Sequence, residues 1–316
     1  MRAKPHCPIP QRQIIIQVSS VIPMRNISIL IPTFNDLCLN QVKALKQQAD
    51  KIKDLRYEIL VADDGSTDTA VVDSNRQINA IENCVLVELD HNVGRAAIRN
   101  FLGKKATHER LLFLDCDVST ADDFIERYVN DESEADIVCG GWAVNDDGNH
   151  WAGNLRYRYE KSMAQQYSAE KRSERGFRSF RTTNFMIRRE VFLDTLFDET
   201  IKSYGYEDVL FGKQLSQKRC SIRHIDNAVT LANYEDNIRF VEKTEDSLRT
   251  LKSLETDLAD FSSLLLAVEK LRRRRLLGVA RAGFSVINKK LRNNLCGANP
   301  QPWCYRLYKL GYYICL

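Results

Sequence analysis

The sequence lacks a long apolar run, paired metal-type cysteines and any internal repeat. No apolar stretch reaches the roughly 18 residues that a membrane-spanning helix needs, and we find no signal peptide ahead of the short patch at residues 14–16. The nine cysteines are scattered, odd in number and without a Cys-x-x-Cys pair. That pattern argues against a disulfide framework and a structural zinc site, and predicts a protein of the reducing cytosol.

Two glycine-rich nucleotide-binding patterns are also missing. The chain contains neither the Gly-x-Gly-x-x-Gly of dinucleotide enzymes nor the Gly-x-x-x-x-Gly-Lys-Ser/Thr of P-loop enzymes. Their absence argues against hydride transfer and ATP hydrolysis.

Acidic residues are scarce at the C-terminal end. Residues 267–316 carry eleven Lys or Arg but a single acid, Glu269, for a net charge of +10, whereas residues 1–266 carry −6. The net charge of +4 therefore hides a mildly acidic body and a strongly basic tail.

Short apolar runs alternate with amphipathic stretches from Asn26 onward. The predicted strands cover residues 27–31, 59–62, 85–89, 111–114, 135–140 and 183–187. The predicted helices cover residues 37–53, 68–80, 93–106, 157–167 and 207–217. This order predicts an α/β fold with a mostly parallel, Rossmann-like central sheet, flanking helices and a C-terminal helical extension.

We expect three parts: an N-terminal extension, disordered or preceding the true start (1–25), the α/β domain (26–242), and a helical, basic, aromatic extension (243–316). In the last part, two sets of apolar residues recur every seven positions. The sets are Leu251, Leu258 and Leu265, and Leu254, Phe261 and Val268. The repeat is short for an independent coiled coil, so it predicts a helix packed on its own domain or on a second copy in a homodimer.

Two carboxylates, Asp115 and Asp117, directly follow the predicted strand 111–114. Open α/β sheets bind their ligands at the carboxyl ends of their strands. Carboxylate oxygens at that edge can bind Mg²⁺ or Mn²⁺, which in turn would hold a diphosphate. An isolated Asp-x-Asp is more often a solvated turn, so its neighbours decide the interpretation.

The first two predicted strands also end in candidate site residues. Pro32, Thr33 and Phe34 close the first strand, and the Phe34 ring could stack on a base. Asp64 follows the second strand in a turn, where its carboxylate can accept from a base N–H.

The third strand is followed by Asn92 and Gly94, which open a helix that contains Arg99. A helix start and a guanidinium group both favour phosphate. Each of these loops alone is an ordinary turn, helix lead-in or surface ion pair, but their order along one rim indicates a shared site.

These ordered motifs make the chain resemble the family 2 glycosyltransferases of the GT-A fold over roughly residues 26–242. The resemblance is carried by residues 29–35, 61–68, 92–100 and 114–117. It implies an inverting transferase that takes a sugar from a nucleotide diphosphate donor, most simply a UDP-sugar. It also implies Mg²⁺ or Mn²⁺ bridging Asp117, assisted by Asp115, and the diphosphate.

Residues 204–212 resemble the family's Glu-Asp motif near the acceptor, after a strand-like segment at 182–189. The resemblance implies that Asp208 is the general base for the acceptor hydroxyl, and Glu207 can orient the acceptor. The ordinary alternative is that both acids complement a helix dipole.

One position departs from the family pattern. Related sequences often carry a metal-binding histidine shortly after the segment 224–229, where this chain has Thr230, Leu231 and Ala232. Leucine cannot bind a metal, so the ion would be held by Asp117, Asp115, diphosphate and water, or by His224. Weakened metal binding or lost activity follows as an alternative.

Two rival functions stay open. A sugar-nucleotide pyrophosphorylase shares a related sheet, but it opens with a glycine-rich loop that residues 32–36 lack. A non-catalytic sugar-nucleotide-binding or scaffold subunit is suggested by Leu231 and the basic tail.

The tail also suggests a location. Its bases, together with Trp303, Tyr305, Tyr308, Tyr312 and Tyr313, suit an anionic membrane surface. We expect a cytoplasmic protein, either with a solvated charge run and a tail packed on the body, or attached peripherally to the cytoplasmic face of the inner membrane. There it would use a carbohydrate or lipid-linked acceptor in surface polysaccharide synthesis. No recognised motif supports nucleic acid binding.

Overall fold

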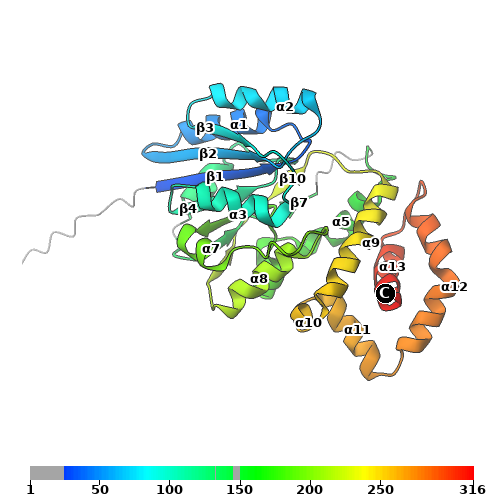
Figure 1. Ribbon diagram of the computed structural model, residues 1–316. Coiled ribbons are helices and arrows are strands. Elements are labelled where there is room, and N and C mark those ends of the chain that lie inside the picture. Colours follow the sequence, from blue (N-terminus) through cyan, green and yellow to red (C-terminus); the bar gives the residue numbers. More distant parts are fainter. Residues whose placement is uncertain (1–24, 132, 145–149) are drawn as a thin grey trace, which may run out of the picture.

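The computed structural model describes residues 25–131, 133–144 and 150–316 (Figure 1). Of the N-terminal extension expected at residues 1–25, all but Arg25 lies outside these ranges. All eight cysteines within the described ranges are free.

The central sheet has seven strands within the described residues, in the order β3-β2-β1-β4-β8-β6-β9. The strands are β1 (Arg25–Thr33), β2 (Leu55–Asp63), β3 (Cys84–Glu88), β4 (Arg110–Leu114), β6 (Ile137–Cys139), β8 (Asn184–Arg188) and β9 (Ile222–His224). Neighbours among the first four strands pair in parallel, whereas β8 runs antiparallel to both β4 and β6. The prediction of a mostly parallel sheet is confirmed.

Helices cover both faces of this sheet, which explains why the central strands are continuous apolar runs. The first half contributes α1 (Leu39–Asp50), α2 (Thr69–Arg76), α3 (Arg95–Lys105) and α4 (Phe124–Val129). The second half contributes α5 (Leu155–Met163), α6 (Ala169–Arg175), α7 (Arg189–Thr195) and α8 (Glu207–Gln217). Apolar residues of α1 and α4 pack on one face, and those of α3, α7 and α8 pack on the other.

A second, small sheet lies beside the carboxyl end of β4. Among the described residues it consists of β5 (Val118–Ser119), β10 (Val229–Leu231) and β7 (Trp142–Ala143), in the order β5-β10-β7. Leu231 pairs with Val118, and the Ala232 N–H donates to the Asp117 carbonyl at 3.0 Å. This pairing fixes the backbone that follows the Asp-x-Asp pair.

The C-terminal helices group beside α5 and α8 (Figure 1). They are α9 (Asn237–Ser253), α10 (Glu255–Leu258), α11 (Ser263–Arg273), α12 (Leu277–Leu295) and α13 (Pro302–Cys315). Helix α9 runs without a break through residues 242 and 243, where the sequence suggested a domain boundary.

The heptad leucines pack inside this group of helices. Leu251 and Leu258 are fully buried, Leu265 is 3% exposed, and all three contact the apolar cluster that includes Leu210 of α8. The seam therefore packs on the chain's own domain, one of the two predicted arrangements.

Candidate functional site at the carboxyl rim of the sheet

The loops after β1 and β2 are bound to each other through Asn35. This residue has a left-handed φ of 56°, and its side-chain oxygen accepts from the N–H groups of Thr67 and Asp68 at 2.8 and 3.0 Å. Its own N–H donates to Ser66 Oγ at 2.7 Å. The loop beginning at Phe34, whose ring is 42% exposed, is thereby held at the rim.

Asp64 joins the loop after β2 to the start of α3. Its buried carboxylate accepts from the N–H groups of Val93 at 2.7 Å and Gly94 at 3.1 Å. Burial raises the pKa of Asp64, while these two donors oppose the shift. Gly94 has φ +96°, which favours glycine, and Asn92 beside it is exposed. The structure therefore brings Asp64, Asn92 and Gly94 together, as expected.

A chain of alternating charges connects three elements of the rim. Arg99 on α3 donates to Asp115 after β4 at 2.7 Å, and its guanidinium lies 3.8 Å from Glu207 on α8. Arg95, one turn before Arg99, contacts Glu207 at 3.1 Å. The Arg99 and Glu207 side chains are only 2% and 7% exposed. Buried charges of this kind are stable only when paired, so the four groups hold one another in place.

The two acids of the Asp-x-Asp pair have different surroundings. Burial raises the pKa of Asp115, but the positive charges of Arg99 and Arg95 outweigh it and the net pKa is lowered. Asp117 is exposed at the rim, and among the described residues it forms no such ion pair; desolvation by nearby protein, with the negative charge of Asp115, raises its pKa. Asp117 is the carboxylate whose oxygens remain open to a ligand.

Glu207 and Asp208 begin α8 after a strained loop. Tyr206 has φ +66° and Gly205 has φ +90°, and the two acids that follow point to different partners. Glu207 contacts the arginines of α3, whereas Asp208 lies 3.6 Å from Arg181. Burial raises the pKa of Asp208, and Arg181 opposes the shift. A carboxylate with a raised pKa next to a half-exposed guanidinium suits proton transfer.

His224 is not available as the alternative metal ligand. Its Nδ1 lies 3.0 Å from an Arg172 guanidinium nitrogen and its Nε2 lies 3.1 Å from the Gly176 carbonyl oxygen, so both ring nitrogens are occupied. Burial lowers its pKa to about 4. Leu231 is buried in the core, and the described residues contain no group of three or more His, Cys, Asp or Glu arranged around a metal.

The carboxylates that remain could supply only some of the ligands that a hard cation needs. Asp117 and Asp115 offer carboxylate oxygens, which Mg²⁺ and Mn²⁺ prefer. If Asp117 and Asp115 held such an ion, its other ligands would have to be diphosphate oxygens and water, as Mg²⁺ usually accepts.

Two arginines at the site, Arg95 and Arg181, were not among the predicted site residues. Arg95 is four residues before Arg99, so both lie on one face of α3, and this spacing was a usable signal. Arg181 contacts Asp208 and stacks 5.2 Å from the Trp142 ring centroid. These partners are 27 and 39 positions away along the chain, so no local pattern pointed to Arg181.

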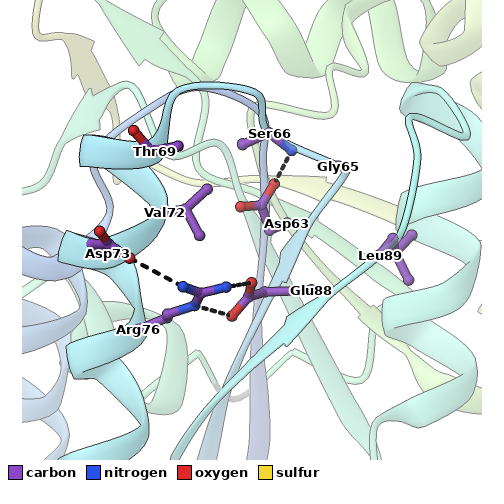
Figure 2. A pocket seen from close by; sticks show the side chains of 9 residues that line it. All are labelled: Asp63, Gly65, Ser66, Thr69, Val72, Asp73, Arg76, Glu88 and Leu89. Atoms are coloured by element: carbon purple, nitrogen blue, oxygen red, sulfur yellow. Dashed lines mark hydrogen bonds and ion pairs between the residues drawn. The ribbon is translucent and has the colours of Figure 1, made fainter.

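A separate pocket of about 310 Å³ lies on the α2 side of the loop after β2 (Figure 2). The Arg76 guanidinium lies between Asp73 and Glu88 there, and the Asp63 carboxylate accepts from the Ser66 N–H at 2.8 Å. None of the predicted site residues lines this pocket. We therefore assign the candidate site to the open rim.

Comparison with known proteins identifies the family. The sequence model described as glycosyl transferase family 2 matches residues 28–196. The chain belongs to this family. The match includes the loops after β1, β2, β3 and β4, but it ends before Glu207 and Asp208.

Two curated relatives are similar over part of their length. An uncharacterized glycosyltransferase of Haemophilus influenzae is 36% identical over 107 residues, which cover 33% of this chain and 41% of that protein. A poly(ribitol-phosphate) beta-glucosyltransferase of Bacillus spizizenii is 35% identical over 119 residues, covering 36% of this chain and 18% of that protein. The matched regions thus span less than half of either relative.

Two solved structures share the fold. The mannosyltransferase PcManGT from Pyrobaculum calidifontis, in complex with GDP-Man and Mn2+, has a TM-score of 0.56 and 14% identity, covering 92% of this chain and 84% of that one. S. aureus TarS 1-349 has a TM-score of 0.52 and 17% identity, covering 92% and 89%. Both neighbours are GT-A glycosyltransferases, and the predicted fold class is confirmed.

Proposed function

We propose that this family 2 protein transfers a sugar, with inversion, from a nucleotide diphosphate donor to a carbohydrate or lipid-linked acceptor. The observation that carries the proposal is that Asp64, Asp115, Asp117 and Asp208 lie at one rim with three arginines, Arg95, Arg99 and Arg181. A donor diphosphate needs cations, and an acceptor hydroxyl needs a base; the rim offers both.

The donor would lie over the loops after β1, β2 and β3. Phe34 has an exposed ring for a base, next to Pro32 and Thr33. Asp64 connects the loop after β2 to the loop after β3, because its carboxylate accepts from the N–H groups of Val93 and Gly94. A UDP-sugar remains our preferred donor, and the GDP-Man complex of the mannosyltransferase neighbour makes GDP-sugars the first alternative.

The phosphates would meet the cations of α3. Arg99 is almost fully buried and bound to Asp115, so it acts mainly by fixing that carboxylate. Arg95 is 49% exposed and is the cation of α3 that can reach a ligand. A divalent ion held by Asp117 and Asp115 would neutralise the leaving diphosphate. The Mn2+ in the mannosyltransferase neighbour supports this role.

Asp208 would act as the general base. Its carboxylate accepts the proton of the acceptor hydroxyl as that oxygen bonds to the anomeric carbon, opposite the departing nucleoside diphosphate. Glu207, held by Arg95, orients the helix start that carries Asp208. Arg181 at 3.6 Å would stabilise the ionised form of Asp208.

The proposal includes the process in which the transfer takes part and its location in the cell. The poly(ribitol-phosphate) beta-glucosyltransferase relative supports a role in polysaccharide synthesis. The location at the cytoplasmic face of a membrane is a prediction from the basic tail. No nucleic acid partner is proposed.

The test is a screen of the purified protein against a panel of UDP- and GDP-sugars with Mg²⁺ or Mn²⁺, without acceptor. Slow, metal-dependent hydrolysis of one nucleotide sugar is expected, because water can replace the acceptor hydroxyl. Metal-dependent binding without any turnover, with or without acceptor, would favour the scaffold alternative that Leu231 suggests. Release of pyrophosphate from UTP and a sugar phosphate would favour a pyrophosphorylase.

A further inference from the structure

The surface of α12 divides into two faces. Phe284, Leu291 and Leu295 are at most 7% exposed and pack inward with α13. The fit is tight, because a Cβ on Gly311 of α13 would lie 2.0 Å from the Phe284 ring. Helix α12 thus has a firmly seated inner face and lies at the outer edge of the molecule (Figure 1).

The outer face of α12 carries an exposed apolar stripe. Val279 is 70% exposed, Val286 is 82% exposed, and Leu276 just before the helix is 42% exposed. Val279, Gly283 and Val286 follow one another at intervals of four and three residues, so they share one side of the helix. Because these two valines bury little of their apolar surface in the fold, they contribute little to its stability.

Basic residues flank this stripe. Lys289 and Lys290 lie on either side of it one turn after Val286, and Arg274 and Arg275 are exposed at its start. Within the described residues none of these four has an acidic partner, whereas Arg272 and Arg273 are paired with Glu269. Together, Leu276, Val279, Val286 and these four bases form what we call the α12 outer face.

The tail tyrosines do not contribute to this face. Tyr305, Tyr308 and Tyr313 are at most 5% exposed and pack α13 against its neighbours. The sequence-based expectation that they contact lipid is therefore wrong for these three. Among the described residues, no helix combines the length and the hydrophobicity needed to cross a bilayer.

We infer that the α12 outer face docks on an anionic lipid bilayer, with Val279 and Val286 entering the headgroup boundary and the four bases meeting acidic headgroups. An exposed apolar stripe flanked by unpaired cations is the pattern of a helix that lies in the membrane interface. A second copy fits less well, because a two-fold contact would bring eight like charges together. The inference does not depend on the proposed reaction.

The test is flotation of the full chain with vesicles of phosphatidylcholine, alone or mixed equally with phosphatidylglycerol. We expect recovery with the anionic vesicles only, decreasing as salt is added. Lys289→Gln with Lys290→Gln should weaken binding about 30-fold, at roughly one decade per 1.4 kcal/mol and about 1 kcal/mol per base. Val279→Asp with Val286→Asp should abolish it.

Matched controls lie on the opposite side of the molecule. Val85 on the edge strand β3 is 43% exposed, and Lys51 and Lys53 are exposed after α1. Val85→Asp, and Lys51→Gln with Lys53→Gln, should leave flotation unchanged. Truncation is a poor substitute, since it removes the buried α13 residues.

Three results would overturn the inference. The first is failure of the wild-type chain to float with anionic vesicles. The second is equal flotation of the α12 variants and their controls, with all chains folded by circular dichroism. The third is a dimer by light scattering that the valine variant disrupts while vesicle binding is unchanged.

Discussion

Neighbouring carboxylates in this protein take different tasks because their partners differ. Glu207 and Asp208 are adjacent, yet Glu207 lies against two arginines of α3, whereas Asp208 lies 3.6 Å from Arg181 and accepts from the Val209 N–H. The same division separates Asp115, bound to Arg99, from the exposed Asp117. In each pair one acid is bound by an arginine of α3, and we propose that the other meets the ligand.

Asp208→Asn should remove transfer and retain donor binding. The amide keeps the shape of the carboxylate but cannot accept the hydroxyl proton, so the rate should decrease by about 10²–10⁴-fold. The measurement is sugar transfer alongside calorimetric titration with the donor. Asp122→Asn, an exposed aspartate before α4, is the control. Unimpaired turnover of the Asp208 variant would remove the base assignment.

As the pH is lowered, the rate of transfer should begin to decline at a higher pH than it would if Asp208 had the pKa of an ordinary aspartate. Asp208 must be ionised to act as a base, and burial raises its pKa above the usual 3.8. We expect the acid limb of the pH profile of kcat to lie above pH 4, measured where circular dichroism shows the chain is folded. A flat profile down to pH 4 would contradict this role.

His224 should make folding stability depend on pH. Its pKa is near 6.5 when unfolded and about 4 when buried, so the folded chain resists protonation. The free energy of unfolding therefore has its full value, as far as His224 is concerned, above pH 6.5. It decreases by about 3 kcal/mol as the pH falls from 6.5 to 4, because the unfolded chain binds the proton more readily.

The comparison of wild type with His224→Gln isolates this effect from the carboxylates that titrate in the same range. Denaturant unfolding at several pH values should show the loss in wild type and not in the variant. His91→Gln, at an exposed histidine, should behave as wild type. Parallel pH curves for wild type and His224→Gln would contradict the assignment.

At the scale of elements, α9 supports the loop that precedes Asp208. Thr250 donates to the Tyr204 carbonyl at 2.9 Å, and a Cβ on Gly205 would lie 2.8 Å from the Cβ of Ser247. Helix α9 therefore fixes the backbone that leads into Glu207 and Asp208.

Gly205→Ala should destabilise the chain more than Gly94→Ala. Both glycines have positive φ, for which a Cβ costs about 1–3 kcal/mol, but only Gly205 also meets Ser247. Adding Ser247→Gly should recover part of the loss for Gly205→Ala and none for Gly94→Ala. The measurement is the free energy of unfolding; equal effects of the two alanines would show that α9 does not confine the loop.

Several elements could be predicted because their signals are local. Apolar runs bounded by turns predicted the parallel strands, and the rule that ligands bind at carboxyl ends brought Asp64 and Asp115 to one rim. The small sheet of β5, β7 and β10 was missed because its strands have only two or three residues. Such segments are too short for a periodic pattern.

At the scale of the whole molecule, the sequence could not reveal which side chains pair. Arg99 meets Glu207, 108 positions later, and the heptad leucines pack inside their own chain. Both outcomes depend on tertiary packing. The basic tail was recognised by composition, but only the structure separates the inward tyrosines from the outward valines of α12.

The central claim is that the loops at the rim hold a nucleoside diphosphate through a divalent ion at Asp117. The most direct test is calorimetric titration of the chain with UDP, and then GDP, with and without Mn²⁺. The account predicts heat of binding with one nucleotide only when Mn²⁺ is present, and none for Asp117→Ala. Absence of heat for every nucleotide in wild type, or equal binding by Asp117→Ala, would contradict it.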